Sequence, residues 1–197
     1  LFNFLTGQID ILFLWLALRL PAGGWKAVAA GALLTLKPQL AAVVLPWFLL
    51  RWLLKDRALL LKWAGVTAGL HLLPLLLDGG IYAKWLGALS GVSEMKVPLS
   101  SGLFSLTALD IPLWLLAVVG LALALWGLAR DEPTSRAAQL FSFPLTIWYD
   151  DVLLAGAAPA WLLVPYSWAA FILAYLLSSN LPLATIPLAA LGWLWVR

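Results

Sequence analysis

The sequence predicts an all-α, polytopic transmembrane helix bundle, and three observations lead to this fold class. The chain has 197 residues, of which 64% are hydrophobic and only 11% are charged, and its mean hydropathy is +0.99. Soluble domains are about half apolar and about a quarter charged, and a small domain cannot hide this much apolar surface. Because a helix needs about 20 apolar residues to cross a bilayer, the length allows about seven to nine crossings. We therefore expect a single transmembrane domain over residues 1–197.

Apolar segments of helical length alternate with short joints that contain charged residues, glycine or proline. The expected helices cover residues 4–18, two short arms within 25–52, and residues 58–77, 112–129, 137–149, 152–164, 168–179 and 183–196. Tight turns are expected at 51–57, 130–133 and 165–167. The only long loop, residues 78–111, is expected to hold a short interfacial helix near Trp85 and Leu86.

The distribution of basic residues predicts the orientation, because cytoplasmic turns are rich in lysine and arginine. Placing the turns at 19–26, 51–57, 130–136 and 165–167 and the C-terminus in the cytoplasm leaves six acids and three lysines on the outer side. The nine basic residues on the cytoplasmic side are Arg19, Lys26, Arg51, Lys55, Arg57, Lys62, Arg130, Arg136 and Arg197, of twelve in the chain. We expect a multi-pass plasma-membrane protein whose active face is extracytoplasmic.

The segment around residues 26–50 must then leave the cytoplasmic side and return to it. Each arm has about a dozen residues, or about 18 Å of helix, which is less than the bilayer core of about 30 Å. The segment is therefore predicted to be a re-entrant helical hairpin with Lys37-Pro38-Gln39 at its tip. Irregular backbone at membrane depth survives only where protein or water surrounds it, so the tip is expected to line a cavity open to the outside.

Lys37 is the most informative residue for function, because a lysine within an apolar segment is costly and marks a functional site. Its compact ammonium suits a phosphate group. The alternative is that Lys37 extends to the outer headgroups or pairs with an acid such as Asp10. His71, within the helix over 58–77, is expected to be satisfied by a neighbouring helix rather than to carry chemistry.

Two further clusters are candidates for binding sugar hydroxyls on the outer side. Gln8 and Asp10 precede the first helix, where the alternative role is helix capping. Trp148 and Tyr149 can stack on a sugar or belong to the interfacial aromatic belt. They precede Asp150 and Asp151, which can act as a base, a metal ligand or a sugar clamp, whereas capping the next helix needs only one of the two.

Other chemistries have little support in the sequence. The chain has no cysteine and one histidine, so thiolate or histidine metal sites and a Ser-His-Asp triad are not expected. Phosphate-binding glycine motifs and zinc-protease motifs are missing. No basic, aromatic-rich surface suggests nucleic acid. We expect no cofactor and no nucleic-acid partner.

Four sequence pieces resemble glycosyltransferase family 87, a family of the GT-C superfamily of polytopic membrane glycosyltransferases. These pieces are Gly7-Gln8-Ile9-Asp10, the glycine-containing helix that ends in Lys37-Pro38-Gln39, the basic turn from Arg51 to Arg57, and the segment from Phe143-Pro144 to Asp150-Asp151. Two positions depart from the family pattern. Asp10 stands where asparagine is usual, and the Asp150-Asp151 pair replaces a position often occupied by histidine.

The resemblance implies a GT-C-like enzyme that moves a sugar, mannose or a similar one, from a polyprenyl-phosphate donor to a lipid or glycan acceptor with inversion. Lys37 and Gln39 would then contact the donor phosphate, and the two outer clusters would line the sugar and acceptor pocket. The family's catalytic acid, expected to be an Asp, would lie in an outer loop upstream of Leu1. The chain is thus expected to be the C-terminal part of a longer protein and to be inactive alone. The alternatives are a multi-pass transporter or lipid flippase and a non-catalytic membrane subunit.

Overall fold

The computed structural model describes residues 11–84, 87, 102–143, 153–155, 157–179 and 181–197. Within these residues every regular element is a helix, and the only β-type pairing is an isolated bridge between Ala155 and Ala158. The prediction of an all-α fold is confirmed. After helical residues 11–17, the elements are η1 (Leu20–Ala22), α2 (Gly24–Leu34), α3 (Pro38–Lys55), α4 (Arg57–Leu77), η2 (Leu103–Leu109), α6 (Leu113–Leu128), α7 (Glu132–Ser142), α8 (Ala160–Leu177) and α9 (Leu181–Val196).

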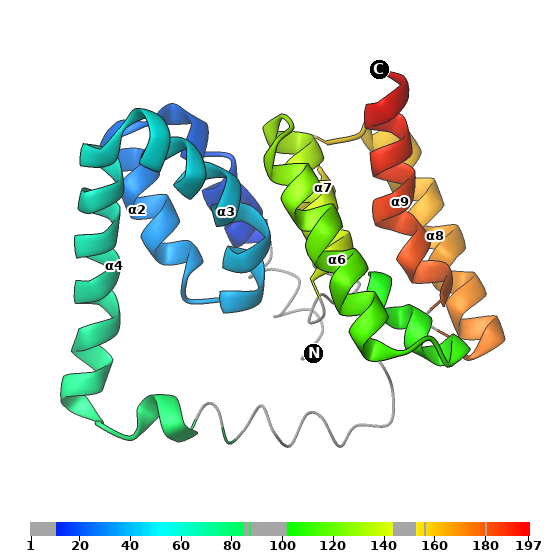
Figure 1. Cartoon of the computed structure of the whole chain (residues 1–197), viewed down its shortest axis with the longest axis horizontal. Helices are drawn as coiled ribbons and strands as arrows, with labels where there is room; N and C mark the ends of the chain where they lie inside the picture. Colours follow the sequence, from blue (N-terminus) through cyan, green and yellow to red (C-terminus); the bar gives the residue numbers. More distant parts are fainter. Residues whose placement is uncertain (1–10, 85–86, 88–101, 144–152, 156, 180) are drawn as a thin grey trace.

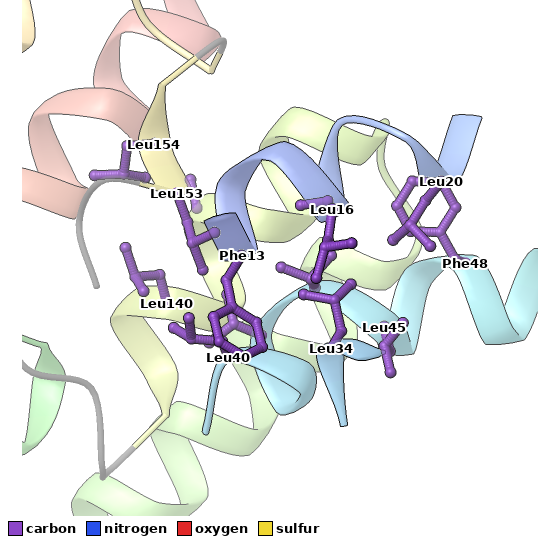
Figure 2. Close-up of a cluster of buried hydrophobic side chains, with 14 of the residues drawn as sticks. Phe13, Leu16, Leu20, Leu34, Leu40, Leu45, Phe48, Leu140, Leu153 and Leu154 are labelled. Carbon is purple, nitrogen blue, oxygen red and sulfur yellow. The ribbon is translucent and has the colours of Figure 1, made fainter. Parts of the chain in front are cut away.

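The helices form two groups that meet where α3 packs against α7 (Figure 1). In the first group α2 packs against both α3 and α4, and in the second α7 lies between α6 and α9, with α8 on the far side of α9. The core that joins the groups includes apolar side chains from residues 11–17, η1, α2, α3, α7 and the segment at 153–154 (Figure 2), and it extends to α4, α8 and α9. Leu34, Leu40, Leu140 and Leu153 are fully buried there.

Helices α2 and α3 form a hairpin, as the sequence predicts, but its two arms differ in length. Helix α2 has 11 residues, whereas α3 has 18, which correspond to about 16 Å and about 27 Å. The expectation of two equally short arms was wrong because α3 continues through Arg51 to Lys55. In place of the predicted turn over residues 51–57, only Asp56 separates α3 from α4. The Asp56 Oδ1 accepts a hydrogen bond from the Leu59 backbone N–H at 3.0 Å and caps α4.

The second half of the chain differs from the prediction at two prolines. Helix α7 begins at Glu132, after an Asp131 cap, and ends at Ser142 because Phe143 precedes a proline and is extended; residues 144–149 lie outside the described part. Residues 165–167 were predicted to be a cytoplasmic turn between two helices, but they lie inside α8. Pro165 removes only one backbone donor near the start of α8, and this is not enough to break a helix whose other backbone groups are paired.

The helix ends divide between two ends of the molecule. The start of α2, the α3–α4 and α6–α7 turns and the C-terminus lie at one end, which we call the basic end (Figure 1). The α2–α3 tip, the end of α4, η2 and the α8–α9 turn lie toward the opposite end. Apart from residues 165–167, the turns predicted to be cytoplasmic therefore share one end of the described chain.

Large apolar side chains cover much of the outer surface. Among the described residues, α4 alone is long and apolar enough to cross a bilayer, and only 6% of its most apolar stretch is buried. Leu61 is 72% exposed and Leu76 and Leu77 are each 82% exposed. Helix α8 carries a similar set at its end, where Tyr175, Leu176 and Leu177 are all exposed. In water these faces would be costly, whereas lipid tails solvate them.

Helices α6 and α7 approach closely at Gly127, and this contact gives a first testable prediction. A Cβ atom at Gly127 would lie 2.7 Å from the Ala138 Cβ and 3.4 Å from the Ser135 Cα. We expect Gly127→Ala to force the helices apart and to lower the free energy of unfolding by about 1–3 kcal/mol. The measurement is thermal unfolding in detergent followed by circular dichroism.

The matched control is Gly65→Ala in α4, where an added Cβ would meet nothing within 4 Å. There the lower helix propensity of glycine dominates, so alanine should raise stability by about 0.5–1 kcal/mol. Equal shifts in the two variants would show that the α6–α7 contact does not depend on the glycine.

Candidate functional site

The tip of the hairpin spans residues 35–37 and places Lys37 at the first turn of α3. Proline at position 38 disfavours helical backbone at the residue before it, and Lys37 accordingly has φ −121° and ψ 86°. Proline itself is well suited to the first position of the next helix because the missing N–H would be unpaired there. Lys37 is therefore the N-cap residue of α3, and Gln39 follows in the first turn. Both side chains are partly buried.

A hydrogen bond between α2 and α4 shows how deep the tip lies. The Thr35 Oγ1 donates to the Ala32 carbonyl at 2.6 Å and lies 2.7 Å from the His71 Nε2. His71 is six residues before the last residue of α4, Leu77, which corresponds to about 9 Å of helix. The tip thus stops level with the interior of α4, as Figure 1 also shows, and does not reach its end.

The His71 imidazole joins the tip to the segment that follows α4. Its Nδ1 lies 2.8 Å from the Tyr82 hydroxyl, which also lies 3.0 Å from the His71 carbonyl oxygen. Because the Thr35 hydroxyl proton points to Ala32, the Thr35 oxygen accepts from the Nε2–H of His71. The Tyr82 hydroxyl donates to the His71 carbonyl oxygen. The prediction that a neighbouring helix satisfies His71 is confirmed. Sequence reasoning missed Thr35 and Tyr82, whose only signal was that each is a polar residue next to an apolar helix end.

An ion pair closes the segment after α4. The Lys84 Nζ lies 2.6 Å from the Asp78 Oδ2, and the Gly80 backbone N–H donates to Oδ1 at 3.0 Å. The Lys84 ammonium, with the help of the Gly80 amide, lowers the pKa of the Asp78 carboxyl below its usual value. Asp78 ends α4, as predicted, and Lys84 belongs to a solvated pair.

The remaining predicted site residues fall outside the described part of the chain. They are Gln8, Asp10, Trp148, Tyr149, Asp150 and Asp151. The interfacial helix expected near Trp85 and Leu86 also centres on residues that are not described. Of the predicted site, the structure therefore brings together only Lys37 and Gln39, and it adds the Thr35–His71–Tyr82 chain beside them.

The basic end carries a repeated pattern that the predictions overlooked. Arginine follows tryptophan by four residues in the last turns of three helical segments or just after them, and each guanidinium lies over its own indole ring. The distances from Cζ to the ring centroid are 4.8 Å for Arg19 on Trp15, 5.0 Å for Arg51 on Trp47 and 5.1 Å for Arg130 on Trp126. Arginine is attracted to the face of an indole ring by a cation–π interaction and can stack flat on it. The Trp-x-x-x-Arg spacing was visible in the sequence and recurs at Trp193 and Arg197.

Removing the hydrogen-bond partner of His71 provides a second prediction. Thr35→Val keeps the shape of the side chain but leaves the Nε2–H without its acceptor, so we expect a loss of about 1–3 kcal/mol in the free energy of unfolding. Thr35→Ser keeps the hydroxyl and should stay within about 0.5 kcal/mol of the unchanged chain. Denaturant titration of both variants measures the difference. A Thr35→Val chain as stable as Thr35→Ser would mean that the bond does not fix the tip.

Comparison with known proteins gives no match: no family model, no curated protein and no solved structure matches the chain.

Proposed function

We propose that the chain is part of a polytopic membrane glycosyltransferase of GT-C type, which moves a mannose-like sugar from a polyprenyl-phosphate donor to a lipid or glycan acceptor. In this proposal the α2–α3 hairpin is re-entrant from the outer side, and Lys37 binds the donor phosphate. The single observation that carries the proposal is a lysine at a hairpin tip that stops about 9 Å before the end of the neighbouring apolar helix.

Two features of the described chain support placement in a membrane. Helix α4 is of spanning length and almost entirely unburied, and exposed apolar side chains continue over α6 and α8. The turns rich in lysine and arginine share the basic end, which agrees with a cytoplasmic location under the positive-inside rule. The hairpin tip faces away from that end, so the donor would bind from the extracytoplasmic side.

The local electrostatics of the tip support a phosphate ligand. Lys37 carries a positive charge at the N-terminus of α3, where the helix dipole is also positive. Two positive sources at one point favour a bound anion. The amide of Gln39 in the same turn can donate to a phosphate oxygen. The Thr35–His71 bond holds this turn at its depth.

The proposed reaction is a displacement at the anomeric carbon of the sugar. An outer carboxylate takes the proton from the acceptor hydroxyl while the acceptor oxygen bonds to the anomeric carbon. The bond from that carbon to the phosphate oxygen breaks, which inverts the configuration and releases polyprenyl phosphate. Lys37 stabilises the charge that develops on this phosphate. Gln8, Asp10, Trp148, Tyr149, Asp150 and Asp151 would hold the sugar and the acceptor.

A reconstitution experiment tests the proposal against its alternatives. The chain, expressed together with any coding sequence upstream of Leu1, is placed in vesicles with polyprenyl-phosphate mannose labelled in the sugar. Label that appears in an acceptor glycan supports the transferase. Label that crosses the bilayer still attached to its lipid supports a flippase instead. If neither occurs and other membrane proteins co-purify with the chain, the non-catalytic subunit is correct.

A further inference from the structure

A cavity at the basic end is not used by the proposed reaction. It has a volume of about 390 Å³ and opens to the surface between the α6–α7 turn and the last two turns of α9. Small-molecule sites have volumes from about 300 to 1,000 Å³, so the cavity is large enough for a ligand. Its polar side comes from Arg130, Asp131 and Thr134, and its apolar side from Trp126, Leu191, Leu194 and Trp195.

The polar side presents one positive and one negative group next to each other. The Arg130 guanidinium is stacked on Trp126 at 5.1 Å, and among the described residues no hydrogen bond to it is found. The Asp131 Oδ1 caps α7 by accepting from the Thr134 backbone N–H at 3.2 Å, which leaves Oδ2 for a ligand. The turn itself is anchored, because the Trp47 Nε1 donates to the Arg130 carbonyl at 2.9 Å.

We infer that this cavity binds a phospholipid whose headgroup carries both a phosphate and a primary ammonium, as in phosphatidylethanolamine. The Arg130 guanidinium matches the phosphate, since its planar fork binds two oxygens. The Asp131 carboxylate matches the ammonium. The Leu191, Leu194 and Trp195 side chains of α9 provide an apolar wall for the start of an acyl chain. An anionic headgroup would satisfy Arg130 but would place a negative charge or a hydroxyl beside Asp131.

The inference goes beyond the proposed function. It rests on the chain being in a membrane and does not depend on sugar transfer. If the chain does not transfer sugar, the lipid-binding inference is unaffected. If the chain does not bind lipid in the cavity, the transferase proposal is unaffected.

Native mass spectrometry of the purified chain in detergent tests the inference directly. The probes are phosphatidylethanolamine, phosphatidylcholine and phosphatidylglycerol with identical acyl chains, each titrated separately. The unchanged chain should bind phosphatidylethanolamine about tenfold more tightly than the other two, because a charge-assisted hydrogen bond to Asp131 is lost with each of them. Equal affinity for all three lipids would overturn the inference.

Three variants separate the two charges from general effects. Asp131→Asn should remove the preference for phosphatidylethanolamine while keeping α7 capped, because asparagine caps as well as aspartate. Arg130→Gln should weaken binding of all three lipids by about tenfold. Arg57→Gln removes an exposed positive charge at the same end, outside the cavity, and should change nothing. If Arg57→Gln weakens lipid binding as much as Arg130→Gln does, the affinity depends on the net charge of the basic end and not on the cavity. That result would contradict the inference.

Discussion

Replacing Lys37 with alanine is expected to lower sugar transfer by a factor on the order of 10² to 10³, because the leaving phosphate loses its positioned cation. The chain should still insert and fold, since Lys37 is a partly exposed residue at a helix start. Initial rates with labelled polyprenyl-phosphate mannose, compared at equal amounts of folded protein, measure the loss. Lys37→Arg keeps the charge and should retain part of the activity.

Lys84→Ala is the matched control for this experiment. Lys84 is also on the predicted outer side, but its ammonium pairs with Asp78 on the surface. Exposed pairs contribute about 0–1 kcal/mol, so transfer should remain within a few-fold of normal. If Lys37→Ala transfers sugar at the normal rate, Lys37 does not bind the donor phosphate. If Lys37→Ala and Lys84→Ala lose activity equally, sugar transfer depends on the total charge of the outer surface and not on a specific contact of Lys37.

The largest effect on stability is expected at the buried pair of Glu132 and Arg136. The Arg136 Nε lies 3.5 Å from the Glu132 Oε1, and the arginine side chain is only 4% exposed. Glu132→Lys removes the counter-charge of the buried Arg136 and places a second positive charge beside it, and a buried charge left uncompensated costs about 3–5 kcal/mol. Chemical denaturation of the variant, compared with the unchanged chain, measures the cost.

Replacing both partners of this pair should have the opposite outcome. Burial raises the pKa of Glu132 and lowers the pKa of Arg136, and in each case it outweighs the attraction between them. The double variant Glu132→Gln with Arg136→Met removes both buried charges, so its stability should match or exceed that of the unchanged chain. A double variant as unstable as Glu132→Lys alone would show that the loss comes from packing.

The raised pKa of Glu132 also predicts how stability changes with pH. In the folded chain Glu132 holds its proton to a higher pH than in the unfolded chain, where the usual value is 4.5. Its contribution to stability is therefore complete below that value and is lost as the pH rises through the folded pKa. The slope of unfolding free energy against pH in this window should be shallower in Glu132→Gln. An unchanged slope would assign the titration to other groups.

Local sequence signals predicted the features that depend on neighbouring residues. Lys37 and Pro38 correctly predicted the position of the hairpin tip, and Asp78 correctly predicted the end of α4. Helix capping and the backbone restriction by proline both depend on residues only a few positions apart. Pro165 misled the prediction, since the same residue type is tolerated near the start of α8, where it removes a single hydrogen bond. A proline therefore ends a helix only where other features of the sequence also favour a break.

Features that depend on distant residues could not be read from the sequence. The bond between Thr35 and His71 joins residues 36 positions apart, and the basic-end cavity needs α9 to meet the α6–α7 turn. No sequence spacing predicts either contact, because the packing of the helices determines which of their residues meet. The sequence prediction placed Arg136 in a surface turn, whereas the structure buries it. The neighbouring residues do not indicate that α7 lies between α6 and α9.

The recessed position of the hairpin tip has a consequence for the effect of ionic strength. Mobile ions at physiological salt screen exposed charges beyond about 8 Å, but they screen partly buried charges such as Lys37 much less. A phosphate bound at Lys37, about 9 Å inside the end of α4, would be attracted almost equally in dilute and concentrated salt. The affinity for the donor should therefore be nearly independent of added sodium chloride, whereas binding to exposed charges weakens as salt is added.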